Sequence, residues 1–189
     1  PDMDSMVIAT PWKKKPTRFY YNQKINCMPA TGVACKGDEK YEFQSDEDES
    51  YGVLDWGRGV WTYKNKWYWA SASGRLEDGT RIGWNLGYGF SDRSYASENM
   101  VFYGGKAHKL DEITFHFDEE DYLKPWKISS NDGKFEMIMD PLVDRSSKTN
   151  LLLIKSVQHQ VFGLHSGFFI LDDGTKVEVN DQMGFAEKV

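Results

Sequence analysis

The sequence predicts an all-β fold, an antiparallel meander of short strands that closes into a barrel with little helix. Aromatic residues are abundant: 7 Trp, 10 Tyr and 11 Phe stand beside 17 Gly in 189 residues. This mixture favours strands and tight turns over helices. No window of about a dozen residues keeps apolar side chains at helical spacing without a Gly or Pro interrupting it. At most one or two short helices fit, with the best candidate near Asp118 to Leu123.

The expected strands follow one another along the chain. Residues 1 to 18 contain three prolines and no periodicity, so we expect a lead-in segment or an edge strand there. From Phe19 onward, runs rich in aromatic and β-branched residues alternate with turn signals, so residues 19 to 189 are expected to form a single antiparallel β-barrel domain. The clearest expected strands are Lys66 to Ser73, Arg81 to Phe90, Asn99 to Tyr103, Glu112 to Phe117, Lys134 to Met139, Val161 to Leu171 and Thr175 to Val179.

Dipeptides that contain Gly mark the expected hairpin turns. Two-residue type I′ turns need positive φ at both central positions, which Asp and Gly tolerate. Three pairs fit this pattern, and Gly104-Gly105 is a fourth candidate. The three pairs are Asp78-Gly79, Asp132-Gly133 and Asp173-Gly174.

Charge and composition exclude several classes of function. The chain has 23 Lys and Arg against 29 Asp and Glu, a net charge of −6, so no nucleic-acid partner is expected. No apolar run approaches the roughly 18 residues that a membrane helix needs, so no membrane span is expected either. Cys27 and Cys35 are too few for a disulfide framework or a Cys-rich zinc site, and they suit a reducing cytoplasm.

No metal and no cofactor is expected. The acidic stretch 46–49 is predicted to be a solvated loop, and it fails as a calcium loop because Tyr51 stands where the turn needs Gly. His159 and His165 would lie about 20 Å apart in an extended strand, which is too far for one metal ion.

The stretch DWGRGVW, residues 55–61, is the first candidate for a site, together with Trp67-Tyr68-Trp69 just after it. In a strand, Trp67 and Trp69 share one face, so their indoles are able to stack on a ligand or to fill the core. Asp55 and Arg58 form either a local ion pair that stiffens the loop or a charge pair that orients a ligand.

The stretch 82–90 is the second candidate. Alternation places its small residues and Asn85 on one face, which leaves room for a ligand or for a bulky neighbouring strand. Glu98-Asn99 then opens the next strand, where a carboxylate in an apolar run either pairs with Arg58 or takes part in acid–base chemistry. His165 either lines the pocket or is a satisfied histidine of the wall or of the surface.

These candidates are assigned to one site. A buried Arg needs an anionic partner, so Asp55, Arg58, Asn85 and Glu98 are expected to converge. Asp55 and Glu98 are the candidate catalytic acids. The candidate ligand-binding residues are Arg58, Trp61, Trp67, Trp69, Asn85, Asn99 and His165.

Seven spaced motifs resemble a known family. They are DWGRGVW, WYWA, GxNLG, SENM, LVDR, QVFGLHSGFF and DDGTKVEVNDQMGFAE. In this order they resemble the carboxy-terminal portion of the bacterial domain-of-unknown-function 2804 family, over about residues 19 to 188. More distantly, that family is similar to lipocalin-like (calycin) proteins with two barrels, among them carotenoid hydratases and tocopherol cyclase. The resemblance implies a lipocalin-like barrel, and the chain is then either part of a longer two-barrel protein or a short member of the family.

Three functions follow as hypotheses. The first is a binding module that holds a hydrophobic or amphipathic small molecule in its barrel. The second is a cofactor-free hydratase, cyclase or isomerase that acts on an isoprenoid-like or other apolar substrate, with Asp55 or Glu98 as the acid. The third is a structural or interaction domain, which exposed tryptophans would favour.

Overall fold

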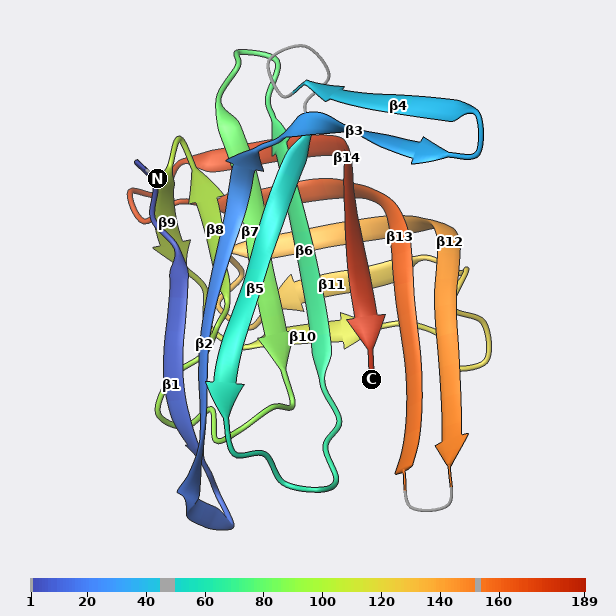
Figure 1. Ribbon diagram of the computed structural model, residues 1–189. Helices are drawn as coiled ribbons and strands as arrows, with labels where there is room; N and C mark the ends of the chain where they lie inside the picture. The colour runs from blue at the N-terminus through green and yellow to red at the C-terminus, as the bar shows by residue number, and fades with distance from the viewer. Residues whose placement is uncertain (1, 45–49, 152–153) are drawn as a thin grey trace.

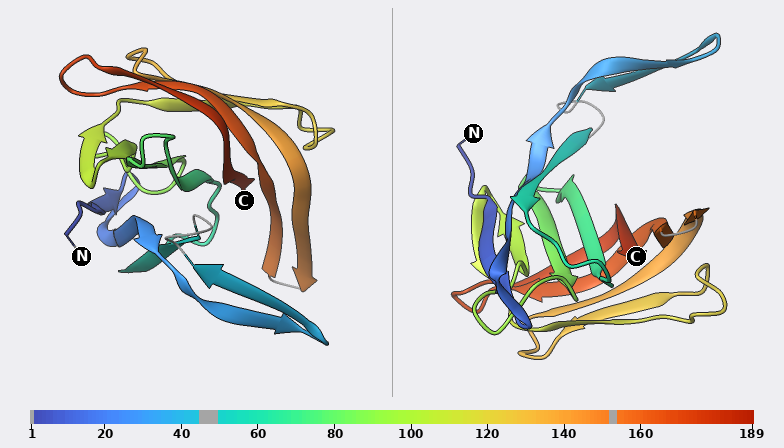
Figure 2. Two further views of the ribbon diagram at one scale, coloured as in Figure 1. Left: turned by 90° about the horizontal axis from the view of Figure 1, so that it is seen from above. Right: turned by 60° about the horizontal axis from the view of Figure 1, so that its bottom comes forward.

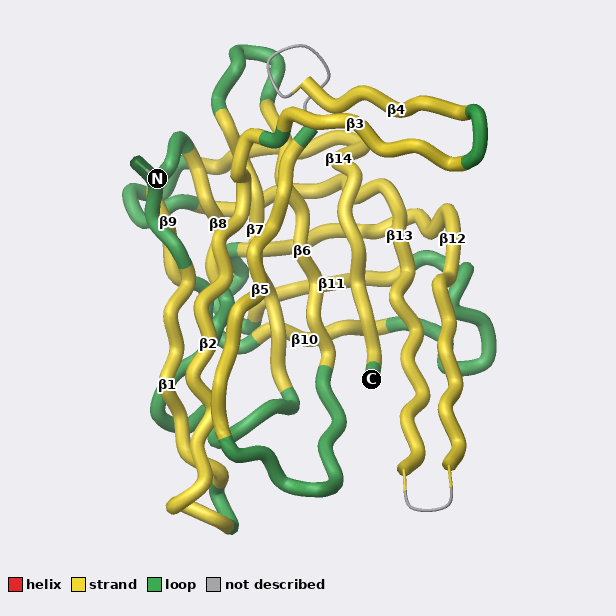
Figure 3. Tube along the Cα trace, in the orientation of Figure 1, coloured by secondary structure: helices red, strands yellow, loops and turns green. Residues whose placement is uncertain are grey.

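The computed structural model shows a protein built of β-strands (Figure 3). It describes residues 2–44, 50–151 and 154–189, and within these ranges there is no helix. The all-β prediction is therefore confirmed. The best helix candidate forms turns instead, in which Asp118 and Asp121 accept backbone N–H groups two residues ahead. The acidic stretch 46–49 lies outside the described residues.

The strands pair antiparallel in three sheets (Figure 1). The first has the order β1-β2-β5, with β1 at Met6–Trp12, β2 at Lys15–Pro29 and β5 at Tyr51–Gly59. A two-stranded hairpin consists of β3, Thr31–Lys36, and β4, Glu39–Gln44. The third has nine strands in the order β10-β11-β12-β13-β14-β6-β7-β8-β9. Their bounds are β6 Tyr68–Arg75, β7 Arg81–Tyr88, β8 Met100–Tyr103, β9 Lys106–Lys109, β10 Ile113–His116, β11 Trp126–Ser130, β12 Phe135–Leu151, β13 Ile154–Ile170 and β14 Lys176–Lys188.

The nine-stranded sheet curls into a half-barrel because its three longest strands bend. The first part of β12, the last part of β13 and the first part of β14 run across the back of β6 and β7 (Figures 1 and 2). The remaining parts of these three strands turn and run alongside β6. Register shifts between Pro141 and Val143 and between His165 and Gly167 interrupt the pairing at the bends, as β-bulges do. The curl buries the main hydrophobic core, whose largest members include Trp84, Leu86, Trp126, Phe135, Met137 and Phe169.

The three-stranded sheet packs over the other face of β6 and β7 (Figure 2). At one end of this contact, Met6, Ile8 and Tyr20 form a second buried cluster with Phe90 and Met100. The strands β6 and β7 are therefore a middle layer, with an apolar core on one side and the three-stranded sheet on the other. The β3–β4 hairpin projects from the body, and every residue of its two strands is exposed.

The three Asp-Gly pairs are at hairpin turns, but the predicted type I′ geometry is wrong for them. Only the Gly of each pair has positive φ, at 86° for Gly79, 72° for Gly133 and 88° for Gly174. Each Gly N–H donates to the carbonyl three residues before it, and each Asp accepts from the N–H two residues ahead. This is a three-residue loop, a type I turn followed by a left-handed Gly. The Gly104-Gly105 pair does have positive φ at both positions, 57° and 87°.

Gly167 provides a test of the close packing at the bend of β13. A Cβ at this position would collide with the backbone carbonyl of Glu136 on β12, which cannot move without breaking the ladder. Gly167→Ala should therefore lower the free energy of unfolding by about 1–3 kcal/mol or more. Gly32→Ala, where a Cβ meets nothing within 4 Å, is the control, and urea denaturation of both variants makes the comparison. Equal stability would contradict the described bend.

Candidate functional site

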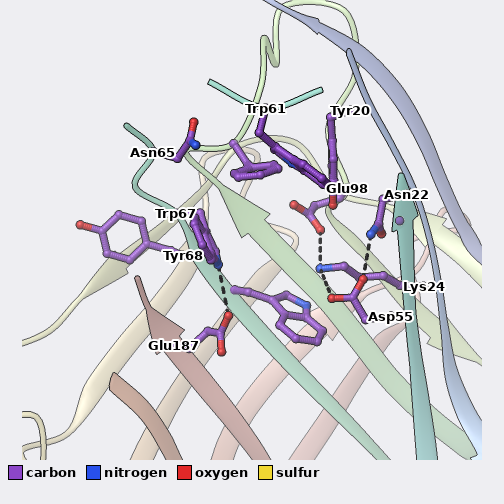
Figure 4. A pocket seen from close by; sticks show the side chains of 13 residues that line it. Tyr20, Asn22, Lys24, Asp55, Trp61, Asn65, Trp67, Tyr68, Glu98 and Glu187 are labelled. Atoms are coloured by element: carbon purple, nitrogen blue, oxygen red, sulfur yellow. Dashed lines mark hydrogen bonds and ion pairs between the residues drawn. The ribbon is translucent and has the colours of Figure 1, made fainter. Parts of the chain in front are cut away.

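A pocket of about 480 Å³ lies between the three-stranded sheet and the middle layer (Figure 4). Its walls are aromatic, from Tyr20, Trp61, Trp67, Tyr68, Trp69 and Phe90. Its polar groups come from Asn22, Lys24, Asp55, Asn65, Glu98 and Glu187. Solvent reaches the pocket, since the side chain of Asp55 is 39% exposed and Trp61 is 42% exposed.

Lys24 is the central charge of the pocket, although it is almost fully buried. Its ammonium lies 3.1 Å from Glu98 Oε2 and 3.8 Å from Asp55 Oδ2. It also lies 3.7 Å from the centre of the Trp69 ring, in cation–π contact. A buried ammonium needs such partners, because burial without them costs several kcal/mol.

Lys24 reaches the pocket because successive side chains of β2 point to opposite faces of the strand. Tyr20, Asn22 and Lys24 are two residues apart, so all three side chains point from β2 toward the middle layer. Asn22 Nδ2 donates to Asp55 Oδ1 at 2.7 Å, across the β2–β5 pairing. Gly57 makes room for this amide, because a Cβ there would lie 2.8 Å from Asn22 Nδ2.

Glu98 is held from the middle layer. Asn85 on β7 donates to the Glu98 backbone carbonyl at 2.9 Å and to Glu98 Oε2 at 3.2 Å. The Asn85 carbonyl oxygen in turn accepts from Trp69 Nε1 at 2.8 Å. Gly87 leaves space for the carboxylate, since a Cβ there would lie 2.7 Å from Glu98 Oε1. The hydrogen bonds therefore run without a break from Trp69 through Asn85 and Glu98 to Lys24.

Phe90 contacts several aromatic side chains at the mouth of the pocket. Its ring lies 4.8 Å from Tyr20, 5.2 Å from Trp67 and 6.2 Å from Trp61, centre to centre. Strict alternation would put Phe90 on the opposite face, with Trp84 in the main core. The alternation ends because Gly89 has φ +96°, a conformation that side chains other than hydrogen rarely allow.

Glu187 forms the wall opposite to Asp55 and is itself buried. It accepts from Trp67 Nε1 at 3.2 Å, and from Gln158 and Gln160 at 3.2 and 3.3 Å. Burial raises the pKa of the Glu187 carboxyl, and these hydrogen bonds and the charge of Lys24 only partly oppose that effect. Burial also raises the pKa of Tyr20, and the nearby Glu98 and Asp55 charges add to the rise.

The structure brings together most of the residues predicted from the sequence. Asp55, Glu98, Trp61, Trp67 and Trp69 all line the pocket. Asn85 lies directly behind Glu98 and fixes its position.

The expectation that Arg58 joins this cluster is wrong. Arg58 is exposed, two residues along β5 from Trp56, so both lie on the face of the strand that points away from the pocket. Within the described ranges no ion pair of Arg58 is found, and Lys24 occupies the place between the two carboxylates instead.

Asn99 and His165 are buried outside the pocket. Asn99 accepts from the Gly87 N–H at 2.8 Å and donates to the Asp111 carbonyl at 2.9 Å, which ties β7 to the β9–β10 connection. His165 lies in the main core with its ring 5.4 Å from that of Trp84. Burial lowers the pKa of His165 to about 4, so the ring is neutral at physiological pH.

The sequence reasoning missed Tyr20, Asn22, Lys24, Asn65 and Glu187. The signal in β2 was an alternating series of polar residues, which in an antiparallel strand usually faces water. Glu187 is the last residue of the DDGTKVEVNDQMGFAE motif and carried no other distinguishing feature.

The described part of the chain has no group of three or more His, Cys, Asp or Glu side chains placed to hold a metal ion. Nor do the described residues include a helix that is long and apolar enough to cross a membrane. Cys27 is buried, Cys35 is exposed, and both are free thiols.

The fold and the site define an antiparallel half-barrel protein with an aromatic pocket built around a buried lysine. The model of a protein family described as "Domain of unknown function (DUF2804)" matches residues 1–189, so the chain belongs to this family. The match covers the whole chain and not only residues 19 to 188. Searches of curated proteins and of solved structures gave no match.

Lys24 and Arg58 make a direct test of where the central charge lies. Lys24→Met should lower the free energy of unfolding by about 3–5 kcal/mol, because it leaves the largely buried Glu98, whose side chain is 11% exposed, without its cation. Arg58→Ala should change it by less than about 1 kcal/mol, because the side chain is exposed. Urea denaturation of both variants at neutral pH measures the difference. A larger loss for Arg58→Ala than for Lys24→Met would contradict this arrangement.

Glu187 gives a test that depends on pH. Because burial raises its pKa, the unfolded chain ionises this carboxyl at a lower pH than the folded chain does. Glu187 should therefore reduce the free energy of unfolding as the pH rises from about 4.3, the ordinary value for Glu, through the raised pKa. Glu187→Gln lacks this effect, so its stability relative to wild type should increase over that window. Urea denaturation of both proteins across the window measures the sign, and a relative decrease would contradict it.

Proposed function

We propose that this protein binds an amphipathic small molecule in the pocket between the three-stranded sheet and the middle layer. The observation that carries the proposal is the combination of an aromatic wall with a charged floor. The floor consists of Lys24, Asp55 and Glu98, whose charged groups already have partners. Lys24 and Glu98 form an ion pair, and the hydrogen bonds from Trp69 to Asn85 and from Asn85 to Glu98 hold the floor in place. A ligand can therefore enter without paying to reorganise these groups.

The size and lining of the pocket support this proposal. Pockets for small molecules occupy about 300–1,000 Å³ and are mostly apolar with a few placed polar groups. This pocket has about 480 Å³, six aromatic side chains and a small set of polar ones. Trp61 is half exposed at the mouth, where an apolar ligand would cover it.

The proposal includes the lipocalin-like (calycin) relationship, the carboxy-terminal place in a longer two-barrel protein, and a cytoplasmic location. The curled antiparallel sheet of nine strands supports the first of these. Two free cysteines support the reducing location. The net charge of −6 supports a small-molecule partner over nucleic acid.

An enzymatic role as a hydratase, cyclase or isomerase has less support. A general acid must carry its proton before it reacts, and the two predicted acids face an ammonium instead. Lys24 forms an ion pair with Glu98 and lies 3.8 Å from Asp55, which is an arrangement for two carboxylates. Binding therefore explains this geometry better than proton donation does.

Two exposed tryptophans allow a matched test of binding. Trp61 is 42% exposed and lines the pocket, whereas Trp56 is 46% exposed and packs on Tyr21 outside it. We expect the neutral amphiphiles 1-octanol and geraniol to bind, with Trp61→Ala weakening them by about fivefold or more and Trp56→Ala leaving them unchanged. Titrations followed by indole N–H signals in NMR spectra measure this. The proposal fails if neither compound shifts the pocket indoles, or if the two variants weaken binding equally.

A further inference from the structure

We infer that the ligand carries a cationic amine group and that Glu187 receives it. This inference rests on the proposed function, because it names the chemical class of ligand for the same pocket. It concerns a residue that the floor network of Lys24, Asp55 and Glu98 does not use.

Glu187 is a buried carboxyl without a cation of its own. Its three donors, Trp67, Gln158 and Gln160, are all neutral N–H groups. No ion pair of Glu187 exists within residues 2–44, 50–151 and 154–189, and Lys24 is held by Glu98 and Asp55 instead. Buried carboxylates are normally paired with a cation, so the pocket side of Glu187 is where a cationic partner fits.

The charge balance of the lining favours the same class of ligand. Three carboxylates, those of Asp55, Glu98 and Glu187, face the pocket, and Lys24 is the one ammonium among the described lining residues. With all four groups ionised, the net charge of these lining groups is 1 − 3 = −2. An amine end group would bring this sum closer to neutrality, whereas a carboxylate end group would add a fourth negative charge in a partly desolvated space.

The aromatic neighbours of Glu187 suit a cation as well. Trp67 bonds Glu187 directly, and Trp69 lies opposite it across the β6–β14 pairing. Trp69 already accepts one ammonium, that of Lys24, at 3.7 Å from its ring centre. An ammonium between an indole face and a carboxylate is therefore a contact that this pocket makes within its own chain.

Three probes with the same alkyl chain test the inference: n-octylamine, 1-octanol and octanoate. Because the apolar part is constant, differences in affinity report on the end group. We expect n-octylamine to bind about tenfold or more tightly than 1-octanol, and octanoate to bind more weakly than both. The Trp67 indole N–H signal should move with the amine, because this group donates to Glu187.

The variant Glu187→Gln keeps the shape of the side chain and removes its charge. It should weaken n-octylamine by about tenfold and leave 1-octanol within about twofold. Glu178→Gln is the matched control, since Glu178 lies on the same strand, is exposed and pairs with Lys176 away from the pocket. It should change neither probe.

The outcomes separate the inference from the proposed function. If 1-octanol binds and the amine binds no better, or if Glu187→Gln weakens both probes equally, the inference fails and the proposed function stands. If none of the three probes moves the indole signals of Trp67 and Trp69, the proposed function itself fails.

A pH series on the wild-type protein keeps the test open if Glu187→Gln does not fold. As the pH falls through the raised pKa of Glu187, n-octylamine stays protonated and should lose affinity, while 1-octanol should not. The charged groups facing Glu187 are Lys24 on β2, Asp55 on β5 and Glu98 before β8, and β13 offers it only neutral amides. An amine affinity that is constant down to the ordinary Glu pKa would overturn the inference.

Discussion

The buried ammonium of Lys24 is the interaction on which the rest of the site depends. It extends from β2 in one sheet to Glu98, which the middle layer holds through Asn85. This ion pair joins the two sheets across the pocket, and the hydrogen bonds that Asn26 and Cys27 of β2 make to β6 and β7 join them further along β2. A buried pair of this kind contributes little net stability compared with apolar packing, but it fixes geometry strongly, because either partner alone would be a buried unpaired charge. Asp55 and Trp69 contact the same ammonium.

Much of the fold was predictable because strand patterns and turns are local properties. The Asp-Gly pairs mark three hairpins, and the predicted strands from Lys66 onward overlap observed ones. The turn type was not predictable from the dipeptide, because an Asp-Gly pair also fits a type I turn followed by a left-handed Gly. The bends of β12, β13 and β14 were not visible either, since they depend on which strands stack across the core.

The site shows where local patterns stop being informative. Arg58 stands among aromatic residues and therefore suggested a buried cation, whereas Lys24 stands in a polar alternation that suggested a surface strand. Alternation tells which side chains share a face, but not which face another sheet will cover. The three-stranded sheet turns its Trp56–Arg58 face to solvent and its Asn22–Lys24 face inward. That choice is made by tertiary packing, and no single strand encodes it.

The polar face of this sheet also explains why the pocket exists. On the β1 side of the contact between the layers, the apolar side chains of Met6 and Ile8 close the gap. Next to them on β2, where Lys24 is the register partner of Met6, Lys24 and the carboxylates need hydrogen-bond geometry, so the two sheets cannot pack there as closely as apolar faces do. The space that remains is bounded by rings and has a buried carboxyl, Glu187, in its far wall. A charged layer between two sheets therefore serves as a spacer, and we propose a cationic ligand because Glu187, among the described carboxylates of the pocket, has no cation paired with it.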